Sequence, residues 1–185
     1  MLDAVNWQVI SKGKPDAWLY FYEDFLAVYD KKLRKLTGSY HTPPEVVAPM
    51  IRLVDDVLRK HFHRNAGLAS TDVTIVDTAV GTGTFILGVL RHIAAAVEAD
   101  EGEGAVPQAI ESAIGGLIAF ELQLGPFAVA QLRIYAELLQ LIGKVPRTTP
   151  RMFVTDTLGD PFAEVETLGA WYGKFSITTH STIPA

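Results

Sequence analysis

The chain has 185 residues and no cysteine. Disulfide bonds, zinc sites with cysteine ligands and thiolate nucleophiles are therefore excluded. Long apolar runs are also lacking, because no stretch approaches the roughly 18 to 20 residues that a membrane-spanning helix needs. The N-terminus carries Asp3 and no positive cluster ahead of an apolar core, so it does not resemble a signal peptide, and we expect a cytoplasmic protein.

Positive charge is scarce: 16 Lys and Arg stand against 21 Asp and Glu, a formal net charge of -5. Because neutralisation of phosphates supplies most non-specific DNA affinity, this chain alone is predicted to bind DNA weakly or not at all. The one basic cluster, Lys31, Lys32, Arg34 and Lys35, fits the solvated end of a helix better than a nucleic-acid site. The 49% hydrophobic content argues against disorder and for one domain with a substantial core.

Three common catalytic signatures are missing. The glycine-rich stretch at Gly81 and Gly83 has Ile86 where a dinucleotide fingerprint needs its third glycine, and no Gly-Lys-Ser or Gly-Lys-Thr of a Walker A loop follows. There is no nucleophile elbow of the Gly-x-Ser-x-Gly type. His61 and His63 would point apart on a helix, so we expect no metal site.

Helical periodicity marks the first third of the chain. Apolar residues recur at steps of three and four between Pro15 and Lys35, which predicts an amphipathic helix. These residues are Trp18, Leu19, Tyr22, Phe25, Leu26, Tyr29 and Leu33. A second helix, with its body over 46–62, is predicted to start with Thr42 as its cap, Pro43 in the first helical position and Glu45 closing a capping box.

Strands and helices then alternate. Short apolar and β-branched runs predict strands over 73–77, 116–121 and 151–156, and the segments 85–97, 107–113 and 125–142 predict helices. The acidic, glycine-rich stretch 100–104 is predicted to be an exposed loop. Such alternation implies parallel pairing through right-handed crossovers, and hence an α/β fold with a Rossmann-like sheet.

Three strands leave such a sheet incomplete. We expect an N-terminal helical segment over residues 1–66, a Rossmann-like core over 67–170 and an irregular tail over 171–185, where a weak strand is possible only around 175–179.

Acidic residues stand at the ends of all three predicted strands: Asp77, Glu121 and Asp156. In such sheets ligands bind beyond the carboxyl ends of the strands. Glycines at 81 and 83 would let the backbone approach a ligand closely, and carboxylates can accept hydrogen bonds from ribose hydroxyls or an adenine amino group. A glycine turn without a ligand is the alternative, and three acids in equivalent positions weigh against it.

Three segments resemble motifs X, I and II of the gamma-class DNA adenine methyltransferases. They are residues 37–47 (TGSYHTPPEVV), 77–85 (DTAVGTGTF) and 119–126 (AFELQLGP). The similarity is greatest to the large single-chain type ISP and type IIG restriction-modification enzymes, and it extends over residues 20–166. It implies a methyltransferase fold that binds S-adenosyl-L-methionine, with DNA as the partner of the intact protein.

The resemblance also implies a role for each matched residue. Thr42 would contact the methionine end of the cofactor, with Tyr40 and Pro43 shaping that wall. Asp77 and the backbone of Ala79 to Gly83, including Gly81, would hold the methionine moiety. Glu121 would bind the ribose hydroxyls, and Asp156, Thr157 and Leu158 would hold the adenine. Two departures from the family pattern are Thr78 in place of proline and His41 in place of a tyrosine.

The catalytic tetrapeptide of the family, Asn or Asp followed by Pro-Pro and an aromatic residue, is absent from the sequence. Residues 159–162 (GDPF) lack the second proline and are better read as a turn. We therefore expect a part that binds the cofactor but does not itself methylate DNA. A fragment of an RNA or protein methyltransferase, or a non-catalytic remnant or interaction module, remain the alternatives.

Overall fold

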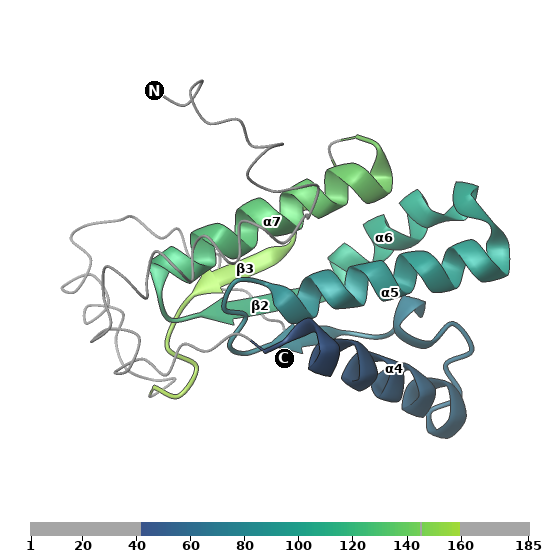
Figure 1. Ribbon diagram of the computed structural model, residues 1–185, viewed down its shortest axis with the longest axis horizontal. Coiled ribbons are helices and arrows are strands. Elements are labelled where there is room, and N and C mark those ends of the chain that lie inside the picture. Colours follow the sequence, from purple (N-terminus) through teal and green to yellow (C-terminus); the bar gives the residue numbers. More distant parts are fainter. Residues whose placement is uncertain (1–41, 145, 160–185) are drawn as a thin grey trace, which may run out of the picture.

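The computed structural model describes residues 42–144 and 146–159. The predicted helix over 15–35, the basic cluster within it, Tyr40 and the tail over 171–185 lie outside the described residues. Figure 1 shows a layer of helices beside a small sheet. In chain order the helices are α4 (Pro44–His61), α5 (Thr84–Glu101), α6 (Val106–Gly115) and α7 (Leu124–Ile142), with short 3-10 turns η2 (Gly67–Ala69) and η3 (Glu103–Ala105) between them.

The sheet has three parallel strands in the order β1 (Ile75–Asp77), β2 (Leu117–Glu121) and β3 (Arg151–Val154). Asp77 pairs with Ala119, and Glu121 pairs with Val154. The predicted mixed α/β architecture with an incomplete parallel sheet is confirmed for this part of the chain. Because all three strands point the same way, their carboxyl ends meet at one edge, where Asp77 and Glu121 are the last residues of their strands.

The core lies between the sheet and the helices. Burial alternates along β2, with Leu117 and Ala119 buried and Ile118 half-buried, so one face of the strand meets the helices. Fully buried aliphatic residues of α5, α6 and α7 pack there: Ile86, Leu90, Ile93, Ile110, Ile114, Ile134 and Leu138. Burying each such side chain contributes about 1.5–3 kcal/mol, so this layer fixes the positions of the strand ends.

The opposite face of the sheet is more open among the described residues. Phe120 and Phe153 pair across β2 and β3 with their rings stacked at a centroid distance of 5.7 Å. Phe153 and Val76 stay about half exposed. No helix of the described residues is long and apolar enough to cross a membrane.

The start of α4 differs from the prediction. Pro43, not Thr42, is the cap residue, with φ of -57° and ψ of 139°, and no side chain caps the helix. The reason is Pro44, which takes the first helical position and forces the residue before it into extended geometry. The predicted capping box of Thr42 and Glu45 is therefore wrong, and the helix begins one residue later.

The predicted loop over 100–104 is also wrong in part. Helix α5 continues through Asp100 and Glu101 and ends at Gly102, whose φ is 91°. The turn η3 follows at once. Glycine tolerates a positive φ without the strain that a Cβ brings, so Gly102 ends the helix, whereas the acidic residues before it are compatible with a helical turn.

Candidate ligand-binding site

A glycine turn joins β1 to α5. Gly81 and Gly83 have φ values of 56° and 87°, which a residue with a Cβ rarely adopts. The N–H of Gly83 donates to the carbonyl oxygen of Val80 at 2.8 Å, and Gly83 is the cap residue of α5. The first N–H groups of α5 therefore point toward the carboxyl edge of the sheet, where they lack helical partners.

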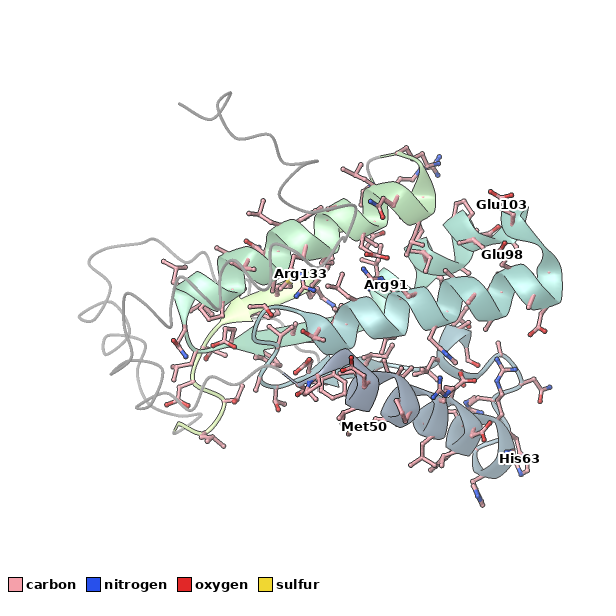
Figure 2. All side chains as sticks on the ribbon, viewed as in Figure 1. Met50, His63, Arg91, Glu98, Glu103 and Arg133 are labelled. Carbon is pink, nitrogen blue, oxygen red and sulfur yellow. The ribbon has the colours of Figure 1, made fainter. Side chains whose placement is uncertain are left out.

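Side chains of helix α7 contact this turn at Thr82 and Gly83. Thr82 is only 1% exposed, and the Arg133 guanidinium donates to its carbonyl oxygen at 2.7 Å and lies 3.3 Å from its hydroxyl oxygen. A Cβ on Gly83 would lie 3.5 Å from the Ala130 methyl group and from Cδ1 of Ile134. Figure 2 shows Arg133 reaching from α7 toward the sheet. The turn is thus held by both a charged hydrogen bond and close packing.

The carboxylate of Glu121 connects β2 to the same turn. Its Oε2 accepts a hydrogen bond from the N–H of Gly81, and its Oε1 accepts one from the N–H of Gln123, both at 2.9 Å. The N–H of Val80 bonds to the carbonyl oxygen of Phe120 at 2.8 Å. A buried carboxylate with two oxygens has about four lone-pair sites, so two remain for a ligand after these bonds.

Asp77 is the second acid of the site. Burial raises the pKa of its carboxyl group, the nearby negative charge of Glu121 raises it further, and the N–H of Ala79, 3.1 Å from Oδ1, acts in the opposite direction. A carboxyl group whose ionisation is opposed by burial and by a neighbouring acid favours a ligand with positive charge beside it.

The segment after β3 joins the site through Thr157, whose hydroxyl donates to the carbonyl oxygen of Thr78 at 3.1 Å. Asp156 binds its own turn, because its Oδ1 accepts the N–H of Leu158 at 2.9 Å. Leu158 is 96% exposed. The turn after β3 therefore borders the turn after β1, with an apolar side chain available to cover a flat ligand.

The predicted site residues are brought together to different degrees. Ala79 bonds to Asp77, Gly81 bonds to Glu121, and Gly83 closes the same turn by its bond to Val80. Thr157 links the turn of Asp156 and Leu158 to this segment through Thr78. Thr42 and Pro43 precede α4 and make no hydrogen bond with these residues in the described part of the chain.

A cavity of about 310 Å³ lies where α4, α5 and α7 meet. Val47 and Ala48 line it from the first turns of α4, Thr84 from the start of α5, and Arg133 from α7. The first turns of α4 are therefore close to the helix that the glycine turn begins.

Arg133 and Gln123 were not predicted from the sequence. The contact of Arg133 with Thr82 joins residues 51 positions apart, and no local motif signals it. Gln123 acts through its backbone N–H, so its residue type carries no signal. Only the position of Gln123, two residues after an acid at a strand end, could have pointed to it.

A parallel strand runs through a glycine turn into a helix, and an acid from the next strand is bonded to the turn. This arrangement defines an α/β protein, and the candidate ligand site lies at the carboxyl edge of its sheet. The family model described as N-6 DNA Methylase matches residues 14–113. This match spans more than half of the chain, and the chain belongs to that family.

Solved structures agree with this assignment. In a cryoEM structure of a DrdV–DNA complex, the matching part has 29% identity and a TM-score of 0.64 and covers 77% of this chain. A nuclease-deletion mutant of the type ISP restriction-modification enzyme LlaGI, in complex with a DNA substrate mimic, has 34% identity, a TM-score of 0.58 and 74% coverage. The ATP-dependent type ISP enzyme LlaBIII bound to DNA has 30% identity, a TM-score of 0.60 and 72% coverage.

These neighbours are far longer than this chain, which spans 13%, 11% and 9% of them respectively. No curated protein sequence matches the chain significantly. The expected resemblance to the methyltransferase region of type ISP restriction-modification enzymes is confirmed by the family and by these neighbours.

Proposed function

We propose that this chain is the S-adenosylmethionine-binding part of a DNA adenine methyltransferase of a restriction-modification enzyme, with a Rossmann-like sheet. The observation that carries the proposal is the cluster of Asp77, Glu121 and the Gly81 turn in a member of the N-6 DNA methylase family. The cofactor bears a positive sulfonium and ammonium at one end and a ribose with two hydroxyls in the middle. The two acids match these groups chemically, because carboxylates attract the positive charges and accept hydrogen bonds from the hydroxyls.

Each residue has one role in this proposal. Asp77 offers its charge to the cationic methionine end, and the backbone from Ala79 to Gly83 approaches that end closely. Glu121 accepts hydrogen bonds from the ribose hydroxyls through the lone pairs that Gly81 and Gln123 leave free. The turn after β3 holds the adenine: Asp156 and Thr157 offer polar atoms, and exposed Leu158 covers the ring. Tyr40, Thr42 and Pro43 complete the methionine side.

When bound, the cofactor would supply a methyl group on a sulfonium, and a neutral thioether would be the leaving group. The residues of this chain bind and orient it, and alignment of the methyl group is the contribution they make to the rate. Since the sequence lacks the Asn/Asp-Pro-Pro-aromatic tetrapeptide, we propose that the 185 residues alone bind the cofactor without methylating DNA, and that DNA is a partner of the intact protein.

Isothermal titration calorimetry with S-adenosylhomocysteine tests this proposal. The purified chain should bind it with one site, and Asp77→Asn and Glu121→Ala should each weaken binding at least tenfold. Asp72→Asn is a matched control, because Asp72 is an exposed acid in a surface ion pair with Arg64. A folded chain without binding would refute the cofactor role, and methyl transfer to DNA by the chain alone would refute the missing catalytic step.

A further inference from the structure

Helix α4 has two apolar faces. One face, with Val47 and Ile51, is buried against α5, where a Cβ on Gly88 would meet both side chains. The second face is a stripe of Val46, Met50, Leu53, Val54 and Val57, which we name the outer stripe. The exposed fractions are 47% for Val46, 48% for Met50, 65% for Leu53 and 50% for Val54. Exposed apolar residues at successive helical turns mark a contact surface.

The outer stripe borders a groove of about 440 Å³ between α4, α5 and β1. Met50 and Val54 belong to both the stripe and the groove lining, and Val76 of β1 and Phe85 of α5 line the other side. Figure 2 labels Met50 on α4, near the N-terminal half of the helix. The surface is therefore a hollow with apolar walls rather than a row of isolated side chains.

We infer that the outer stripe is the docking site for the segment 15–35 of the same chain, packed antiparallel to α4. This segment precedes α4 and lies outside the described residues, and its sequence predicts an amphipathic helix. Residues 36–43 connect it to α4, a length typical of antiparallel neighbouring helices, for which connections of roughly two to eight residues are common.

The spacing of the two stripes agrees with this pairing. Along α4 the outer stripe advances by 4, 3, 1 and 3 residues. Read backwards from Leu33, the apolar positions of the segment also advance by 4, 3, 1 and 3 residues, through Tyr29, Leu26 and Phe25 to Tyr22. Two antiparallel helices joined by a turn meet in this mirrored order. Each pair, such as Tyr29 with Met50 or Leu26 with Leu53, has residue numbers that sum to 79.

The family match gives independent support, because the N-6 DNA methylase model matches residues 14–113, a range that includes both the segment and α4. The segment is thus part of the same family unit as the helix on which it would dock. The docking would also fix both ends of the connection that contains Tyr40 and Thr42. The importance of this for cofactor binding rests on the proposed function.

Crosslinking tests the inference directly, because the chain has no cysteine and each introduced thiol is unique. Tyr29→Cys with Met50→Cys, and Leu19→Cys with Lys60→Cys, are the matched pairs, since both sum to 79. Tyr29→Cys with Lys60→Cys, and Leu19→Cys with Met50→Cys, are mismatched by ten residues, or about 15 Å along a helix. A bismaleimide of about 8–10 Å fits the usual distance between packed helix axes.

The matched pairs should crosslink within one chain at least tenfold faster than the mismatched pairs, at a rate independent of protein concentration. Equal rates, or faster reaction of the mismatched pairs, would overturn the inference. Crosslinks between two chains, formed at a rate that increases with protein concentration, would also overturn it. They would show that a second copy of the chain packs on the outer stripe. None of these outcomes depends on cofactor binding.

Urea denaturation gives a second test that does not depend on the efficiency of crosslinking. Leu53→Lys should lower the urea midpoint clearly, because a covered apolar residue becomes a buried charge, whereas Arg52→Lys at the neighbouring exposed position should not. An unchanged midpoint for Leu53→Lys would mean that Leu53 faces water, and the docking would then be rejected.

Discussion

The N–H of Gly81 donates a hydrogen bond to Oε2 of Glu121 at 2.9 Å, across 40 residues of sequence. Together with the bond from the N–H of Gln123 to Oε1, it fixes both oxygens of the carboxylate at the edge of the sheet. A ligand that uses Glu121 thus meets an acceptor already in position and loses little entropy in ordering it. The same contact makes Glu121 a structural residue of the glycine turn.

Replacement of Glu121 should therefore affect folding as well as binding. Glu121→Ala leaves the N–H groups of Gly81 and Gln123 without their acceptor, and each such group costs about 1–3 kcal/mol where water cannot replace the bond. Because two groups lose their acceptor, urea denaturation should show a loss of about 2–6 kcal/mol. Glu98→Ala, at an exposed position on α5, is the control and should change stability little. Equal stability of both variants would mean that the two bonds contribute nothing.

Asp77→Asn should have opposite effects on stability and on ligand binding. The folded pKa of Asp77 is raised, by burial first and then by Glu121, so the folded chain holds a proton on this group more tightly than the unfolded chain. Any stability from this proton is present below the unfolded pKa of about 3.9 and is lost as pH rises through the folded pKa. At neutral pH the charged group opposes folding.

Asparagine removes that charge and keeps an oxygen for the N–H of Ala79. The variant should be more stable than the wild-type chain at pH 7, and this advantage should shrink as pH falls through the raised folded pKa of Asp77 and be gone below about 3.9. S-adenosylhomocysteine should bind the variant at least tenfold more weakly. Urea titrations at several pH values and calorimetry measure both. If the variant is less stable at pH 7, the ionised form of Asp77 is favourable in the fold and the argument from burial is wrong.

Much of this arrangement was predictable from the sequence, because it follows local rules. The strand runs before Asp77 and Glu121 and the glycines at 81 and 83 predict where each strand ends and where the chain turns. The start of α4 was missed through one position, since two prolines compete there and Pro44 decides the geometry of Pro43. Contacts such as Arg133 with Thr82 depend on how α7 packs on the turn, and local sequence rules do not contain that information.

Asp55 is a buried acid that connects α4 to the turn η2. Burial by itself would raise its pKa, but the N–H of Leu68, 2.7 Å from Oδ1, and the guanidinium of Arg59, 2.8 Å from Oδ2, outweigh it. His92 of α5, 3.3 Å from Oδ2, acts in the same direction. The pKa of Asp55 is therefore lowered in the folded chain, and the charged form is the one that stabilises the fold.

Stability from a lowered pKa is present above the unfolded value and is lost as pH falls through the folded value. Asp55→Asn should cost about 1–3 kcal/mol at pH 7, because the bonds to Leu68 and Arg59 weaken, and the difference from the wild-type chain should shrink below pH 4. Asp56→Asn is the matched control. Its carboxylate lies on the surface beside Lys60, where an ion pair contributes little. A deficit of Asp55→Asn that does not change with pH would contradict the electrostatic cause.

Gly67 is the residue whose replacement should damage the fold most directly. Its φ is 58°, and a Cβ there would overlap the carboxylate of Asp55 and lie 2.8 Å from Nε of Arg59. Gly67→Ala should lower the free energy of unfolding by about 2 kcal/mol or more, since backbone strain and loss of the Asp55 interactions add. Gly104→Ala has open space around the new Cβ and should be nearly neutral. Similar urea midpoints for the two variants would contradict this prediction, because η2 would then move to accommodate the new Cβ without loss of stability.

Arg133 should act on binding through the glycine turn, because it holds the carbonyl oxygen of Thr82 at 2.7 Å without being part of the turn. Arg133→Met keeps the length and apolar character of the side chain but removes the charged donor, a bond that contributes about 1.5–3 kcal/mol. We expect affinity for S-adenosylhomocysteine to fall about tenfold while the circular dichroism spectrum stays unchanged. Arg133→Lys should recover part of the affinity, because an ammonium can donate to the same oxygen. Arg147→Met, at an exposed position, controls for the loss of one positive charge. If Arg147→Met weakens binding as much as Arg133→Met, the effect comes from net charge and not from the position of the turn.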